Sequence, residues 1–255
     1  MGKIMAITNQ KGGVGKTTTS INLASCLAEL GKKVLLVDID PQGNATSGTG
    51  VTKQTLENTI YDLFLQEATF EECAVDSVVD NLKVLPSNVN LSGAEIDLIG
   101  IDDREFILKN ELDKIKDQFD YIIIDCPPSL NLLTVNAMVA ADSVLVPIQC
   151  EYYALEGLSQ LIHTINLIQD RLNENLEIDG IVFTMYDSRT NLSSDVVNDV
   201  KDNIHLHIYE TVIPRNVRLA EAPSYGIPIH MYDKKSAGAE AYENLAKEII
   251  KNTRA

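Results

Sequence analysis

Residues 11–17 of this chain have the sequence KGGVGKT, and they follow a short apolar run. That run, residues 3–8, predicts a buried strand, and apolar residues at helical spacing between positions 21 and 28 predict a helix that stops at Gly31. A glycine-rich loop between a strand and a helix is typical of a phosphate-binding loop. The first thirty residues are therefore expected to form a strand–loop–helix unit that holds an anion.

The residue types in this loop explain why it suits phosphate. Gly12, Gly13 and Gly15 can adopt backbone angles that turn successive N–H groups around an anion, and the next helix adds its N-terminal N–H groups and dipole. Lys16 supplies a full charge for the β and γ phosphates, and the Thr17 hydroxyl is a magnesium ligand. The residues expected to contact the nucleotide here are Lys11, Gly12, Gly13, Val14, Gly15, Lys16, Thr17 and Thr18.

The loop departs from the common pattern G-x-x-x-x-G-K-[ST] at its first position. Gln10 stands where that pattern has glycine, and a second lysine, Lys11, follows it. The sequence therefore has the form K-G-G-x-G-K-T, with one lysine at each end.

Composition predicts one globular domain over residues 1–255. The chain is 45% hydrophobic and shows no linker, repeat or low-complexity run. No apolar stretch approaches the roughly 20 residues of a membrane helix, and the N-terminus enters a strand at once, so a cytoplasmic protein is expected. The four cysteines are scattered without metal-ligand spacing, which favours a role as small core residues.

Apolar runs of strand length alternate with helical patterns along the chain. Several runs are continuously apolar, as in a parallel sheet that helices cover on both faces. This predicts a doubly wound, mostly parallel α/β fold with the ligand beyond the carboxyl ends of the strands. The expected strands are residues 3–8, 34–40, 82–85, 121–125, 143–148, 181–185 and 209–214, and the helices named with them are 155–172 and 236–252.

Acidic residues end two of these strands. Asp125 closes the run YIIID, where a carboxylate can hold the Mg²⁺ shell through water. Asp38 and Asp40 end the run VLLVDID, and strand alternation is expected to put both on one side, with Asp40 orienting the attacking water. Three acids beside a phosphate loop predict a nucleoside triphosphatase with metal residues Thr17, Asp38 and Asp125.

Five segments in this order make the sequence resemble the ParA/Soj family of deviant Walker A ATPases, which position chromosomes and plasmids. They are KGGVGKTT, VDIDPQGNAT, IIIDCPPSL, EYYALEGL and IPRNVRLAEAPSYG, and the resemblance covers essentially the whole chain. The first motif also occurs in relatives such as MinD and the nitrogenase iron protein. The later segments are much more specific to ParA/Soj.

The resemblance implies roles for individual residues. Lys11 matches the signature lysine that reaches the partner's nucleotide across an ATP-bound sandwich dimer. Asp40 matches the residue needed for hydrolysis, and Pro214 and Asn216 fall where family members contact the adenine end of the ligand. The implied cofactors are ATP and Mg²⁺, with Lys11, Lys16 and Asp40 acting in catalysis.

The resemblance also implies non-specific binding to double-stranded DNA, which the overall charge opposes. The chain has 37 acidic and 21 basic side chains, a formal net charge of −16. Residues 214–255 carry +2 and the remainder −18, so a local basic face built by a dimer is expected to bind DNA in a salt-dependent way. Arg189 and Arg218 match positions used for DNA in the family, and the acidic remainder suits the basic segment of a ParB-type partner.

Other functions stay open at this point. A MinD-like membrane ATPase is one alternative, although the C-terminal AKEIIKNTRA lacks an aromatic wedge, so no stable membrane association is expected. An amide-forming ligase, an iron–sulfur reductase and a switch that positions protein clusters are the others. His205 and His207 share one predicted strand face, but two such residues without a third ligand are more typical of solvated histidines.

Overall fold

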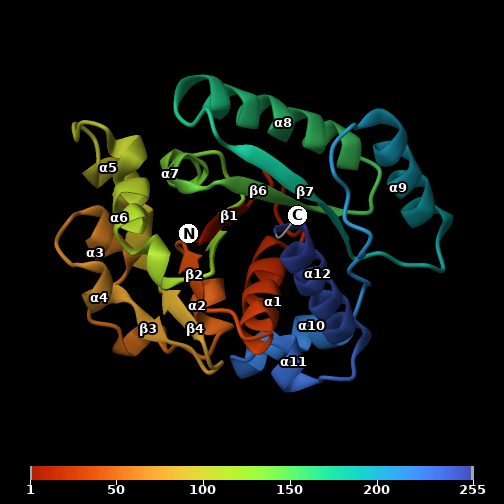
Figure 1. Cartoon of the computed structure of the whole chain (residues 1–255), viewed down its shortest axis with the longest axis horizontal. Coiled ribbons are helices and arrows are strands. Elements are labelled where there is room, and N and C mark those ends of the chain that lie inside the picture. The colour runs from red at the N-terminus through yellow and green to blue at the C-terminus, as the bar shows by residue number, and fades with distance from the viewer. Residues whose placement is uncertain (1, 254–255) are drawn as a thin grey trace.

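The structure, a computed structural model, describes residues 2–253 and contains a seven-stranded sheet in the order β3-β4-β2-β5-β1-β6-β7 (Figure 1). Neighbouring strands are parallel except for β3 and β4, which pair antiparallel. The predicted mostly parallel α/β fold is therefore confirmed. The strands are β1 (Lys3–Ile7), β2 (Val34–Asp38), β3 (Val75–Asp76), β4 (Leu82–Leu85), β5 (Tyr121–Asp125), β6 (Ser143–Gln149) and β7 (Glu177–Thr184).

Helices occupy both faces of this sheet. The α-helices are α1 (Lys16–Glu29), α2 (Asn44–Ser47), α3 (Ile60–Phe64), α4 (Phe70–Cys73), α5 (Ala94–Asp97), α6 (Ile107–Ile115), α7 (Leu132–Ala140), α8 (Ala154–Arg171), α9 (Asn191–Asn203), α10 (Val217–Glu221), α11 (Ile229–Tyr232) and α12 (Ala237–Thr253). The short 3-10 helices are η1 (Lys53–Thr55), η2 (Val89–Gly93), η3 (Arg104–Phe106), η4 (Lys116–Gln118) and η5 (Ala222–Tyr225).

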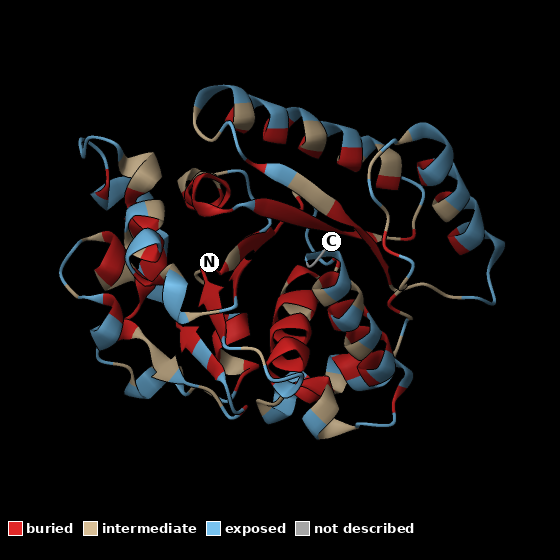
Figure 2. Ribbon diagram, viewed as in Figure 1, coloured by how far each residue is buried: buried red, intermediate tan, exposed pale blue. Residues whose placement is uncertain are grey.

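Two hydrophobic cores lie on opposite faces of the sheet. Strand alternation separates them, since Ile4 and Ala6 of β1 enter one core whereas Met5 and Ile7 enter the other. Helices α6, α7 and α8 supply the first core, and α1 and α12 supply the second (Figure 1). Figure 2 shows the central strands as almost wholly buried. This double covering explains why the strands are continuously apolar.

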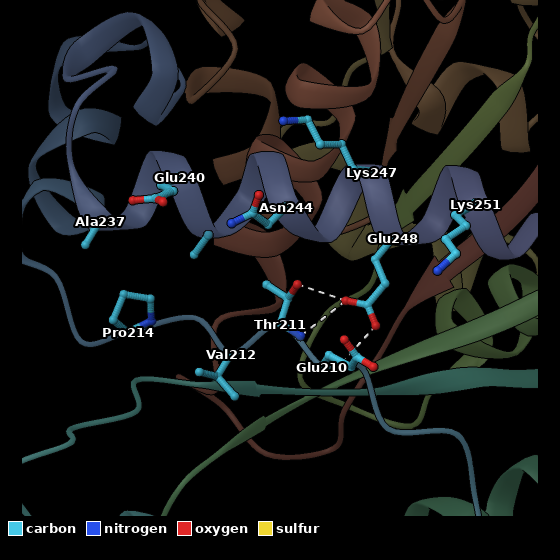
Figure 3. A pocket seen from close by; sticks show the side chains of 11 residues that line it. Glu210, Thr211, Val212, Pro214, Ala237, Glu240, Asn244, Lys247, Glu248 and Lys251 are labelled. Carbon is cyan, nitrogen blue, oxygen red and sulfur yellow. Dashed lines mark hydrogen bonds between the residues drawn. The ribbon is translucent and has the colours of Figure 1, made fainter.

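The predicted strand at residues 209–214 is wrong. This segment runs beside β7, but it forms no continuous ladder there: it has isolated bridges, Ile208 to Ile181 and Pro214 to Tyr186, and a backbone bond from Ile213 N–H to the Phe183 carbonyl at 2.8 Å. Between the bridges, a side chain of α12 takes two of the backbone donors. Glu248 accepts hydrogen bonds from the N–H groups of Glu210 (2.8 Å) and Thr211 (3.2 Å). These three residues line a hollow of about 600 Å³ (Figure 3). A carboxylate therefore replaces part of the strand ladder that the apolar pattern predicted.

The structure agrees with the predicted bounds of two helices and with the predicted burial of the cysteines, but it has one additional strand. Helices α8 and α12 match the predicted ranges to within one residue at each end, whereas the two-residue edge strand β3 was not anticipated. All four cysteines are buried and unpaired, as expected of core residues. Arg254, one of the basic residues counted in the C-terminal segment, lies outside the described residues.

Two further expectations concern membranes and metals. Across residues 2–253, no helix is long and apolar enough to cross a bilayer. In the same range, no three His, Cys, Asp or Glu side chains are grouped to hold a metal ion, so His205 and His207 have no third ligand. The His207 ring instead packs edge-on against Tyr209, with ring centroids 4.8 Å apart.

Gly180 provides a test of how the 209–214 segment is held. A Cβ atom at Gly180 would lie 2.8 Å from the rings of His207 and Tyr209, whereas one at Gly157 of α8 would meet nothing within 4 Å. We expect Gly180→Ala to destabilise the protein by about 1–3 kcal/mol through overpacking. The control Gly157→Ala should stabilise it by about 0.5–1 kcal/mol, because alanine is the better helix former. Urea unfolding measures both, and a neutral Gly180→Ala would contradict this packing.

Candidate active site

The loop between β1 and α1 has the conformation that its glycines allow. Gly13 (φ 77°) and Gly15 (φ 91°) lie in the left-handed region, where a side chain would be strained. Across the described residues, no hydrogen bond has a backbone N–H of residues 12–18 as its donor. The first backbone bond of α1 instead runs from Thr19 N–H to the Gly15 carbonyl at 2.8 Å. These free donors form the cradle for an anion that the sequence predicts.

Lys16 lies inside this cradle. The residue is only 6% exposed, and its ammonium group donates to the Lys11 carbonyl oxygen at 2.8 Å. Burial lowers the pKa of Lys16, while the nearby carboxylates of Asp125 and Asp40 act in the opposite direction. A buried cation with spare donors fits a phosphate group at this position.

Asp125 closes β5 directly beneath α1. It is fully buried, and its Oδ1 atom accepts a hydrogen bond from Ser20 Oγ at 2.8 Å. Its Oδ2 atom is buried without a hydrogen-bond partner among the described residues. A buried carboxylate oxygen of this kind, with the Thr17 hydroxyl close enough to lower the Asp125 pKa, fits the water shell of a Mg²⁺ ion held mainly by phosphate.

Asp38 is the neighbour of Asp125 on the adjacent strand, and both its oxygens are occupied. Oδ2 accepts from the Thr46 N–H (2.8 Å) and hydroxyl (2.7 Å), and Oδ1 accepts from the Asp40 N–H (3.1 Å). Oδ1 accepts only the bond from Asp40, so it keeps a lone pair that a Mg²⁺ ion or its water shell can use. Asp38 as a metal residue therefore stays a prediction, and its visible role is to fix Thr46 and Asp40.

Burial raises the pKa of both carboxyls. Burial is the main cause of the raised pKa of Asp125, and the charge of Asp38 adds to it. Burial also raises the pKa of Asp38, while hydrogen bonds from Thr46 oppose the shift. The edge of the sheet beneath the cradle is thus a site where negative charge is costly until a cation neutralises it.

Asp40 lies beyond the end of β2, so strand alternation does not place it. Its Oδ1 atom accepts from the Gln42 N–H at 2.9 Å, and its backbone carbonyl accepts from Ser87 Oγ at 2.7 Å. Ser87 also donates its N–H to the Thr46 hydroxyl at 2.9 Å. A network from Asp38 through Thr46 and Ser87 therefore fixes the backbone of the residue predicted to orient water.

A cavity of about 380 Å³ adjoins the cradle and contains the residues predicted for the adenine end. Pro214 and Asn216 line it together with Gly15 and Thr18, so the loop and the residues predicted for the adenine end share one cavity. Asn216 also caps α10 by accepting from the Arg218 N–H at 2.8 Å. The other lining residues are Thr184, Met185, Ile213, Arg215, Val217, Leu219, Ala220 and Tyr242.

Lys11 occupies a different environment from Lys16. Its side chain is 44% exposed at the mouth of the loop, and it forms an ion pair with Glu151, which follows β6. The structure therefore shows one lysine committed to the inside of the cradle and one at its rim.

The two arginines predicted to bind DNA are exposed, and each is paired within the chain. Arg189 makes a bidentate contact with Asp187 at 2.9 and 2.7 Å, which lowers the pKa of that carboxyl. Arg218 bonds Glu221 at 2.9 Å. The Arg215 N–H bonds the Tyr186 carbonyl at 2.9 Å, so the two arginine-bearing segments lie side by side.

Several site residues were not singled out from the sequence. Thr184 at the end of β7 packs on Gly15 and donates to the Val14 carbonyl at 2.7 Å, and no local pattern marks it. Ser20 had a usable signal, because it stands one helical turn after Lys16 and so shares its face. Arg215 lines the cavity beside Asn216, and no local pattern marks it either.

Comparisons with known proteins agree with this geometry. A family model described as an AAA domain matches residues 2–178. The sporulation initiation inhibitor protein Soj of Bacillus subtilis is 58% identical over 252 residues, covering 99% of this chain and 100% of the relative. The chromosome partitioning protein ParA of Myxococcus xanthus is 51% identical, covering 98% and 89%.

The chain belongs to the ParA/Soj family. Among solved structures, the cell division ATPase MinD of Pyrococcus furiosus is similar, with a TM-score of 0.82, 30% identity and coverage of 99% of this chain and 100% of that one. Cobyrinic acid a,c-diamide synthase from Mycobacterium smegmatis, solved with an ATP analogue and magnesium, gives a TM-score of 0.89 at 37% identity and covers 100% and 97%. The partitioning relatives and the structural neighbours together support a P-loop ATPase of the partitioning type.

The raised pKa of Asp125 gives a pH-dependent prediction. A carboxyl that holds its proton more tightly when folded makes the protein less stable as pH rises from the ordinary pKa of 3.8 toward the raised one. Asp125→Asn removes this penalty. We expect its free energy of unfolding, relative to wild type without nucleotide, to improve between pH 5 and pH 8 by up to about 1.4 kcal/mol per pH unit. Chemical denaturation at each pH checks this, and a pH-independent difference would contradict it.

Proposed function

We propose that this chain is an ATP-operated partitioning switch. ATP with Mg²⁺ in the loop joins two copies, the pair binds double-stranded DNA without sequence preference, and a ParB-type partner stimulates the hydrolysis that releases it. In this proposal the protein is cytoplasmic, and it associates with the nucleoid when ATP is bound. The single observation that carries the proposal is the different position of the two lysines: Lys16 is buried in the cradle, and Lys11 is exposed at its rim.

The buried residues account for binding and hydrolysis. Lys16 and the free N–H groups of the loop hold phosphate, and Thr17 with Asp125 holds the Mg²⁺ shell. When bound, Mg²⁺ neutralises phosphate charge. Asp40, whose backbone Ser87 fixes, orients water toward the γ phosphate and accepts its proton. Slow basal hydrolysis is expected, in keeping with a step that the partner stimulates.

The rim residue accounts for the coupling between nucleotide and assembly. Lys11 is paired with Glu151 of its own chain. The nucleotide bound by a second copy has phosphate groups, which are stronger negative partners than Glu151. When Lys11 reaches them, an ion pair between subunits replaces the ion pair with Glu151. Two copies would therefore associate only while a triphosphate is present in each loop.

The arginines account for DNA binding in a protein of net charge −16. Arg189, Arg215 and Arg218 lie on adjoining segments next to the adenine cavity. Their carboxylate partners reduce the local positive potential of one subunit. A pair of subunits doubles the number of guanidinium groups that DNA phosphates can engage, so binding follows nucleotide state and falls with salt.

Asp40→Asn tests the hydrolytic step. Asparagine keeps an oxygen that can accept from the Gln42 N–H, but it cannot take a proton from water. We expect ATP binding to be retained and turnover to fall by about 10²-fold or more, with the protein remaining on DNA. Phosphate release and DNA retention are the measurements, with exposed Asp80→Asn as the control. Full turnover in Asp40→Asn would remove the proposed role.

Charge reversal at Arg189 and Arg218 tests the DNA surface. We expect Arg189→Glu/Arg218→Glu to weaken DNA binding at least tenfold and to reduce the slope of log K against log salt by about 3.6, since a dimer loses four phosphate contacts of about 0.9 each. Fluorescence anisotropy with an ATP analogue measures both. The control Lys109→Glu/Lys114→Glu makes the same charge change on α6 and should have the smaller effect. Intact affinity in the arginine variant would show that DNA binds elsewhere.

A further inference from the structure

Residues 89–103, which include η2 and α5, are apolar on two faces. Leu91, Ala94 and Leu98 are fully buried and pack into the core on the α6 side of the sheet. The opposite face carries Ile96 and Ile99, which are 70% and 68% exposed, and Val89 (73%) and Ile101 (39%) flank them. Single exposed aliphatic residues are common on proteins, but four within thirteen residues concentrate exposed apolar surface on one segment, as at interaction sites.

The charge around this patch has one sign. Between Lys83 and Arg104 the chain contains no Lys, Arg or His, whereas Glu95, Asp97, Asp102 and Asp103 are all acidic and all exposed. Tyr61 of α3 donates to Asp97 at 2.9 Å, which fixes that carboxylate at the edge of the aliphatic residues. The surface of residues 89–103 thus combines an exposed aliphatic centre with an acidic rim.

This combination selects the kind of partner. A cationic segment with apolar side chains on one face satisfies both parts, because the apolar side chains cover the isoleucines while lysine or arginine meets the rim. A second copy of this chain fits poorly, since a two-fold contact would oppose the acidic rim to itself. Anionic lipid and DNA phosphate are repelled by the same four carboxylates.

The segment is also connected to the active site along the chain. It begins two residues after Ser87, whose hydroxyl donates to the Asp40 carbonyl and whose N–H donates to Thr46. In Figure 1, α5 lies at the end of the molecule remote from α9, which follows the loop containing Arg189. A molecule seated on residues 89–103 can therefore act on the backbone at Asp40 while the arginine surface remains on DNA.

We propose that residues 89–103 are the docking surface for a cationic amphipathic segment of the partner protein that stimulates hydrolysis. The inference rests on the proposed function, because it assigns a place to the stimulating partner. Docking there restrains the segment that carries Ser87 and so the position of Asp40.

The test compares two matched pairs of exposed aliphatic residues in the full chain, with a purified ParB-type protein as the probe. Ile96→Ser/Ile99→Ser removes the centre of the patch, and Leu30→Ser/Leu167→Ser removes two partly exposed leucines from α8 and the end of α1. We expect all proteins to keep wild-type basal ATPase activity. The partner concentration for half-maximal stimulation should rise at least tenfold in the isoleucine variant and stay within twofold in the leucine variant.

A second pair tests the acidic rim. Asp102→Asn/Asp103→Asn should weaken stimulation severalfold at low salt and reduce its dependence on salt, whereas the exposed control Asp80→Asn/Asp202→Asn should not. Asparagine tolerates the left-handed backbone of Asp103, where φ is 53°.

The outcomes separate this inference from the function on which it rests. Stimulation of the wild type with undiminished stimulation of Ile96→Ser/Ile99→Ser would overturn the docking surface and leave the switch intact. An equal loss in the leucine control would overturn it as well, because the effect would not be specific to the patch. A wild type that the partner never stimulates would instead contradict the proposed function.

Discussion

The arrangement of the active site depends on one constraint, the burial of like charges at the carboxyl edge of the sheet. Asp38 and Asp125 are fully buried neighbours on adjacent strands, and their charge is costly without a cation. Lys16 lies close enough to reduce that cost, yet its own burial makes its charge costly in turn. Mg²⁺ offsets the charge of the two carboxylates, and phosphate offsets the charge of Lys16. Binding of the nucleotide with Mg²⁺ therefore lowers the electrostatic cost of burying all three groups.

The edge also gathers segments that are distant in sequence. The loop after β1, the ends of β2 and β5, the start of the segment after β4 and the residues beside β7 all meet there. Ser87 ties the segment after β4 to Asp40, and Thr184 ties β7 to the phosphate loop. These two contacts connect the edge around the phosphate loop to the segment after β4 and to β7.

The sequence predicts those parts of the structure that local patterns determine. The buried strands, the glycine loop, and Asp38 and Asp125 at the ends of β2 and β5 follow from hydrophobic runs and spacing, whereas Asp40 lies beyond the end of β2 and is not placed by strand alternation. Residues 209–214 fail because Glu248, 37 positions away, takes the backbone donor of Thr211 that a strand neighbour would otherwise use. The hydrogen bonds that occupy both oxygens of Asp38 escape prediction for the same reason, since Thr46 reaches it only through the fold of the intervening turn.

The central claim is that Lys11 exchanges Glu151 for the triphosphate of a second copy. Sedimentation velocity with Mg²⁺ and either ADP or a non-hydrolysable ATP analogue tests it most directly, on the wild type and on Lys11→Ala, with nucleotide binding measured in parallel. The account predicts a dimer only for the wild type with the analogue, and a monomer that still binds nucleotide for Lys11→Ala. A Lys11→Ala protein that dimerises as the wild type does, or a wild type whose mass ignores the nucleotide, would contradict it.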